Sequence, residues 1–207
     1  MKDLLLKIVQ CAIRHNVVSV EEITDAAASV VTSNKPKPIE RWIKKDGVIY
    51  FTEPFVANGW TAQQWKNWFG DNRSDWANQL LDSPDFQPTP EGTIVNPVIL
   101  LGELFPDNER ITRNVRAKEE ELKFVNPNPD LVLLVIKNFS VEEIRAMGLL
   151  WLIGMHEPIK DSAGDPSLLV VRVLDGSPWL DACCDHPGSK WNRECGFVVA
   201  VPQVLVL

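Results

Sequence analysis

The stretch CCDHPGSKWNREC, residues 183–195, contains three of the four cysteines of the chain, with one of its three histidines and one of its eight tryptophans. Zinc in proteins is commonly held by thiolate sulfur and imidazole nitrogen, and a thiolate beside an imidazole is also the arrangement of a nucleophilic enzyme. The residue types alone therefore admit a metal site, a catalytic thiol or an ordinary hairpin.

The spacing decides which of these residues can act together. The segment joins two predicted strands, and alternate side chains of a strand point to the same face. Cys184 and His186 should therefore share one face, opposite to Cys183 and Asp185. A turn within PGSKWN would bring Cys195 across from Cys184 and His186, and His156 or Asp185 would complete a four-ligand zinc site.

Other features of the segment favour a structural role. Two cysteines separated by two residues, the commonest zinc-binding spacing, do not occur, and adjacent cysteines chelate poorly. His156, within MHEPI at 155–159, has neither the zincin nor the deaminase spacing around it. We therefore predict a hairpin with buried thiols and no cofactor. The alternative is a zinc-dependent or thiol-dependent enzyme centred on Cys184, His186, Cys195 and His156.

A second group of candidate residues is aromatic and lies in residues 60–82. Thr61 and Ser74 are good helix N-caps, which predicts helices over 61–69 and 74–81 with a turn at Gly70. Some of the aromatic residues have helical spacing, so they are expected to lie on one face of a helix and to be buried in the core. Any tryptophan that stays exposed would be an anchor for a binding partner. The tryptophans concerned are Trp60, Trp65, Trp68 and Trp76.

The two expected helices resemble a helix-turn-helix over some twenty residues, with a glycine in the turn and an apolar residue six positions later at Trp76. Lys66 departs from that motif, which has a small residue at this position. Further helices are expected over 3–14, 19–31 and 38–47, followed by a strand over 48–52. That order is also the order of a winged-helix element.

A local basic cluster bears on the kind of partner and consists of Lys35, Lys37, Arg41, Lys44 and Lys45. Such a cluster could contact phosphates, but the net charge of the chain is −7, and nucleic-acid binders are usually basic. We therefore expect a protein partner ahead of a nucleic acid.

In the second part of the chain, the apolar residues form short continuous runs, which are typical of buried strands, in place of the helical spacing of the first part. Three prolines and a glycine within 82–92 predict a boundary between a helical, tryptophan-rich region, 1–85, and a sheet-rich α+β region, 86–207, which could still form one compact domain. Helices are expected over 109–122 and from Ser140 to Gly148. About six strands are expected, over 97–104, 130–136, 149–155, 168–176, 178–185 and 196–207.

These observations predict an α+β protein with helices first and a mixed or mainly antiparallel sheet after them. No apolar stretch is long enough to span a membrane, and no export signal is recognisable, which favours a cytoplasmic location and no membrane partner. Exposing the apolar run 197–207 would be costly, so it should be a central strand or an interface between copies of the chain. The expected function is that of a non-enzymatic binding or regulatory protein whose contact region is 35–82.

Overall fold

The computed structural model describes residues 40–173 and 176–202. They belong to one compact unit, Glu40–Leu207. The helices expected over 3–14 and 19–31, together with Lys35 and Lys37, lie outside the described residues. The segment 82–92 lies within this unit.

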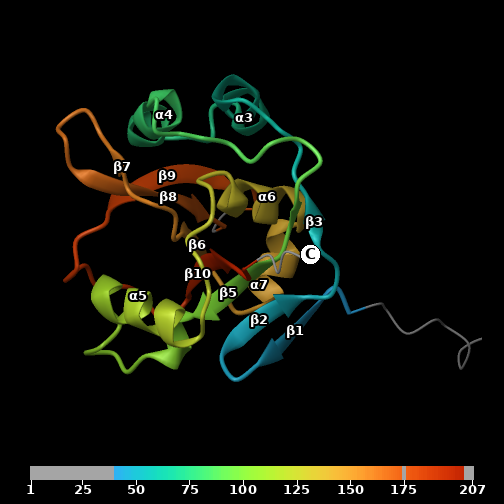
Figure 1. Cartoon of the computed structure of the whole chain (residues 1–207), viewed down its shortest axis with the longest axis vertical. Coiled ribbons are helices and arrows are strands. Elements are labelled where there is room, and N and C mark those ends of the chain that lie inside the picture. Colours follow the sequence, from blue (N-terminus) through green and yellow to red (C-terminus); the bar gives the residue numbers. More distant parts are fainter. Residues whose placement is uncertain (1–39, 174–175, 203–207) are drawn as a thin grey trace, which may run out of the picture. The chain divides into compact units, whose positions relative to one another are not determined.

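The described unit is built around an eight-stranded sheet (Figure 1). Every neighbouring pair in it is antiparallel except β6 and β10, which are parallel. The strand order is β1 (Trp42–Lys45), β2 (Val48–Phe51), β5 (Pro97–Leu101), β10 (Cys195–Ala200), β6 (Trp151–Gly154), β8 (Pro166–Arg172) and β7 (Ile159–Lys160), and β9 (Trp179–Cys184) pairs with the other side of β8. A separate two-stranded ribbon joins β3 (Phe55–Val56) to β4 (Ile94–Val95).

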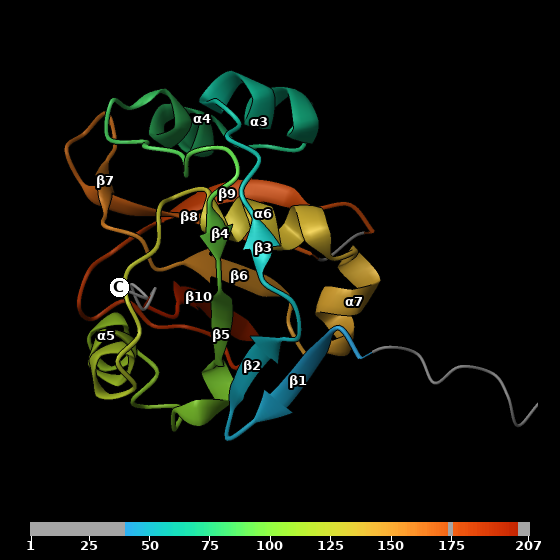
Figure 2. The ribbon, with the colours of Figure 1, turned by 45° about the vertical axis from the view of Figure 1, so that its right-hand side comes forward.

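Five α-helices and one short 3-10 helix of the described residues surround the sheet. They are α3 (Ala62–Phe69), α4 (Asp75–Asp82), α5 (Thr112–Glu121), α6 (Leu131–Asn138), α7 (Val141–Ala146) and η1 (Gly102–Leu104). Figure 2 shows β3 and β4 side by side below α3 and in front of α6. The predicted α+β class and the mainly antiparallel sheet are thus confirmed.

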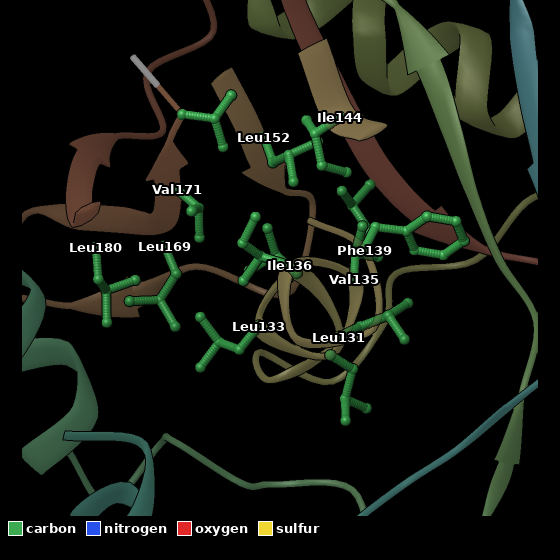
Figure 3. Packing of buried hydrophobic residues seen from close by; sticks show 14 of the residues in the cluster. Leu131, Leu133, Val135, Ile136, Phe139, Ile144, Leu152, Leu169, Val171 and Leu180 are labelled. Carbon is green, nitrogen blue, oxygen red and sulfur yellow. The ribbon is translucent and has the colours of Figure 1, made fainter. Parts of the chain in front are cut away.

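Alternation along the strands divides the buried side chains between the two faces of the sheet. On one face, α6 packs against β6 and β8: Leu133 and Ile136 point toward Leu152, Leu169 and Val171 (Figure 3). The same core includes buried side chains of α3 and α4. On the other face, Val115 of α5 packs with a second set that includes residues of β5, β8 and β10. The sheet is therefore buried on both faces.

The segment expected as a helix over 38–47 is instead the strand β1, so the winged-helix order is not confirmed and the described elements begin with strands. Asp46 and Gly47 both have positive φ, 51° and 73°, and they connect β1 to β2 as a two-residue hairpin turn with Lys45 opposite Val48. A type I′ turn of this kind favours Asp-Gly because both residues must adopt left-handed backbone angles. Gly47 is therefore a turn residue.

The apolar run 130–136 was expected as a strand, and that prediction is wrong: residues 131–138 form α6. All six residues from Leu131 to Ile136 are buried, because this helix is covered on all sides. A helix buried all round shows no polar stripe, so its sequence looks like a buried strand. The sheet also has eight strands where about six were expected.

Candidate functional site

The tryptophan-rich helices form as predicted and are held by their caps. The Thr61 hydroxyl accepts from the Gln64 amide, and the Gln64 side chain returns a bond to the Thr61 amide. At α4, the Ser74 hydroxyl accepts from the Ala77 amide at 3.1 Å. These capping interactions start both helices where the sequence predicts.

The connection between α3 and α4 lies against the edge of the sheet. The Ser74 amide donates to the Leu180 carbonyl oxygen at 2.9 Å, and the Leu180 amide donates to the Asn72 oxygen at 2.9 Å. These bonds cover part of the outer edge of β9, and α4 packs on that strand. The exposed side chains of α4 are Asp75, Gln79 and Asp82. Two of them are acidic, which would repel phosphates at the position of a recognition helix.

The four tryptophans of this region differ in exposure. Trp65 is fully buried, and the rings of Trp60 and Trp68 meet its ring with centroids 4.8 and 6.1 Å away. Trp60 and Trp76 are half-buried against the same core, and the Lys137 ammonium lies 4.8 Å from the centre of the Trp60 ring. Trp68 is 37% exposed. The core-stripe interpretation thus fits Trp65, whereas Trp68 presents its ring to solvent.

Two further large apolar side chains are exposed on the ribbon that leads into α3. Val56 is 63% exposed and Ile94 is 55% exposed, and the two residues face each other across the β3–β4 pair. We call Trp68, Val56 and Ile94 the apolar surface. Isolated exposed apolar residues are common, but a directly paired exposed set and an exposed tryptophan are features of a contact region.

The described part of the basic cluster is largely neutralised by neighbouring acids. The Arg41 guanidinium lies 2.6 Å from a Glu143 carboxylate oxygen and over the Phe139 ring, and the Lys44 ammonium lies 2.5 Å from Glu103. These residues lie at the β1 edge, and α4 lies at the β9 edge. The basic residues and α4 therefore do not make one phosphate-binding face.

The cysteine-rich segment does not form a β9–β10 hairpin. β9 pairs with β8, whereas β10 lies between β5 and β6, so residues 185–194 cross between strands that are not neighbours. This loop is fixed to the start of α5: the Thr112 and Arg113 amides donate to loop carbonyl oxygens, and the Trp191 amide donates to the Arg110 oxygen. The expectation that Cys195 lies across a hairpin from Cys184 and His186 is therefore wrong.

A pocket of about 190 Å³ lies between β9 and this loop, and we call it the loop pocket. Cys183 and Cys195 line it, together with Trp151, Trp191, Asp181 and Lys190. Cys183 and Asp181 lie on one face of β9, and alternation places Cys184 on the other. The predicted opposition of Cys183 and Cys184 is correct, but Cys183 is the residue on the side of Cys195.

The thiols that line the loop pocket are held in their protonated form. Burial raises the pKa of Cys195 to about 11, and burial raises the pKa of Cys183 even further above its ordinary value. For Cys184, partial burial and then Asp165 and Asp161 raise the pKa. A nucleophilic cysteine needs the opposite environment, one that favours the thiolate.

His156 serves a structural role inside the fold. Its Nε2 accepts from the Leu169 amide at 3.0 Å, so Nδ1 carries the proton and donates to the Glu157 carbonyl oxygen at 2.6 Å. Burial lowers the pKa of His156 to about 4. Both ring nitrogens are therefore used by the backbone, while His186 is exposed on the loop. Among residues 40–173 and 176–202, no three His, Cys, Asp or Glu side chains form a group that could hold a metal ion.

A buried polar network that the sequence did not reveal lies beside the loop. The Arg116 guanidinium donates to the Met155 and His156 carbonyl oxygens at 2.7 and 3.1 Å, and lies 3.2 Å from Asp185 and 3.5 Å from Glu119. One oxygen of Glu119 and one of Asp185 have no hydrogen-bond partner. Burial raises the pKa of Glu119 to about 7 in spite of Arg116. Glu119 lies in a run of charged residues on α5, and such a run is typical of an exposed helix face, so the sequence does not indicate that Glu119 is buried.

In the part of the chain that the structure describes, no helix has the length and apolar character needed to cross a membrane. Searches of family models, of curated proteins and of solved structures found no match to this chain.

Proposed function

We propose that this chain is a binding protein that contacts a protein partner through the apolar surface of α3 and the β3–β4 ribbon. The observation that supports this proposal is the exposure of Trp68 together with that of the paired Val56 and Ile94. Tryptophan is enriched among the residues that dominate binding energies, because its large ring buries much area at low entropic cost.

The geometry favours a preformed contact. Trp68 is held edge-on between Trp65 and Phe69, with ring centroids 6.1 and 4.7 Å from its own. Trp65 and Phe69 are both buried, so the exposed ring rests on the core and loses little freedom on binding. An anchor fixed in this way is typical of interfaces that change shape little on binding.

The charges around this region favour protein over nucleic acid. Lys66, on the same helix, is paired with Asp82 at 2.5 Å, and the exposed side chains of α4 include two carboxylates. A nucleic-acid surface needs cations free to replace the counterions of the phosphates. The exposed side chains of α3 are Gln63, Gln64, Asn67 and Trp68, so the described surface of α3 and α4 offers acidic, amide and apolar groups.

Affinity capture with one double variant and one matched control variant tests the proposal. Trp68→Ala combined with Val56→Ser removes apolar area from the surface, whereas Leu122→Ser removes a side chain of similar exposure, 38%, from the end of α5. The proposal expects one protein to be retained by the wild type and by Leu122→Ser, and to be reduced by about tenfold with the double variant. Binding of that protein must then be reproduced with purified components.

Two results would overturn the proposal. One is a captured set that does not change between the wild type and the double variant. The other is a gel shift with DNA or RNA whose affinity falls steeply with salt, since this would identify phosphate contacts as the main source of binding.

A further inference from the structure

The loop pocket has the size and the charge of a small-ligand site. Its volume of about 190 Å³ exceeds the about 150 Å³ that accommodates benzene in an engineered cavity, and lies below the about 300 Å³ at which sites for drug-sized ligands begin. The pocket therefore has room for one aromatic ring with a short substituent.

Two indole rings line the pocket, and one of them is rigidly placed. The Trp191 Nε1 donates to the Thr112 hydroxyl at 3.1 Å, and its ring meets the Phe197 ring edge-on at 5.7 Å. Trp151, from β6, supplies the other indole. Aromatic side chains prefer aromatic ligands, with which they make offset-stacked or edge-on contacts.

Among the charged groups that line the pocket, the ammonium of Lys190 has no partner of opposite charge. Asp181 is neutralised by Arg172, whose guanidinium lies 3.2 Å from its carboxylate and also 5.6 Å from the centre of the Trp151 ring. Among the described residues, Lys190 has no acid within ion-pair distance. The two thiols add no charge, because both are protonated. A ligand with one negative charge would therefore pair with Lys190 at the rim while its ring enters the pocket.

We propose that the loop pocket binds a small aromatic carboxylate with a single ring. This inference is independent of the protein contact at the apolar surface. The loop pocket lies on the face of the sheet that packs against α5, whereas α3 packs with the core on the opposite face. An experiment can therefore reject the ligand site without rejecting the protein contact, and the reverse is also true.

Benzoate is the probe that tests the proposal, with two comparators of nearly equal size. Benzamide keeps the ring without the charge, and cyclohexanecarboxylate keeps the charge without the aromatic ring. Calorimetric titration of the full chain should give a saturable dissociation constant on the order of 1 mM for benzoate. Each comparator should bind at least about fivefold more weakly.

Lys190→Met should weaken benzoate binding by about tenfold, because it removes the charge-assisted bond. Lys45→Met, which removes another exposed lysine, from β1, should leave the affinity unchanged. Because both lysines are exposed, neither variant is expected to disturb the fold, and thermal unfolding verifies this. In amide NMR spectra, benzoate should shift the indole N–H signals of Trp151 and Trp191 and leave that of Trp68 in place.

Three results would overturn the proposal: no saturation up to about 20 mM benzoate, equal binding of benzamide, or unchanged affinity in Lys190→Met. A shift of the Trp68 signal alone would likewise reject the loop pocket, because it would move the ligand to the apolar surface. None of these results would affect the capture experiment described for that surface.

Discussion

Glu119 should make the protein less stable as pH rises, and glutamine at this position should remove that effect. The residue is only 4% exposed, and burial raises the pKa of its carboxyl from 4.5 to about 7, partly offset by Arg116. The folded chain therefore keeps a proton that the unfolded chain releases. This contribution to stability is complete below pH 4.5 and is lost as pH rises to about 7. The difference between the two pKa values corresponds to about 3 kcal/mol.

His156 acts in the opposite sense. Burial lowers its pKa from 6.5 to about 4, so its neutral form supports the fold above pH 6.5 and that support is lost as pH falls toward 4. Between pH 4.5 and 6.5 the folded chain holds one proton more at Glu119 and one fewer at His156 than the unfolded chain. Their effects on stability cancel in the wild type. In Glu119→Gln only the His156 effect remains, with a slope of about 1.4 kcal/mol per pH unit.

Urea unfolding at several pH values, followed by tryptophan fluorescence, measures this difference. All eight tryptophans lie in the unit Glu40–Leu207, so the signal reports the unfolding of that unit. Glu119→Gln should match the wild type near pH 4.5 and exceed its free energy of unfolding by about 3 kcal/mol at pH 8. Glu120→Gln, at the exposed neighbouring position, should show no such change. If Glu119→Gln is instead less stable than the wild type at pH 8, the ion pair with Arg116 outweighs the cost of burial and the reasoning is wrong.

Three other predictions concern local structure and the cysteines. Ser140→Ala should lower the free energy of unfolding by about 1 kcal/mol, because it removes the hydroxyl of a complete capping box with Glu143, and a smaller loss in thermal unfolding would contradict the assigned cap. Alkylation of the folded protein, mapped by peptide mass spectrometry, should modify Cys184 before Cys183 or Cys195, because Cys195 is buried in the core on the α5 face of the sheet and Cys183 packs against that core; rapid modification of Cys195 would argue for an open pocket. The zinc hypothesis predicts about one equivalent of zinc in protein purified without chelators, and less than about a tenth of an equivalent by elemental analysis would end it.

Local capping signals predicted the helices well. The caps Thr61, Ser74 and Ser140 mark the starts of α3, α4 and α7 within the structure. Such signals depend on hydrogen bonds between residues two or three apart, so the sequence contains all the interacting groups. The same holds for the Asp46-Gly47 turn, whose dipeptide indicates a hairpin once the strands on both sides are considered. The helix expected over 38–47 does not form, because β1 and β2 pair across this turn.

Packing partners decide the cases in which local patterns failed. The apolar run from Leu131 to Ile136 is compatible with both a buried strand and a buried helix. Which of the two forms depends on the core that surrounds α6. The residues on both sides of the run favour a helix. Two prolines precede it, and Lys137 lies in its last turn, as basic residues do at the ends of many helices. In a similar way, exposure separates Trp68 from Trp65 only once α3 is placed on the core.

The loop pocket shows why a short connection is weak evidence for a hairpin. Residues 185–194 are few enough to join neighbouring antiparallel strands, but β10 is the more apolar strand and takes a central place between β5 and β6, buried on both faces. β9, with its alternating half-buried residues, takes the edge, where the α3–α4 connection covers it. Burial thus determines the strand order, and the loop must cross from the edge to the centre. The space left beneath that crossing is the loop pocket, so its lining follows from strand order and could not be read from the spacing of the cysteines.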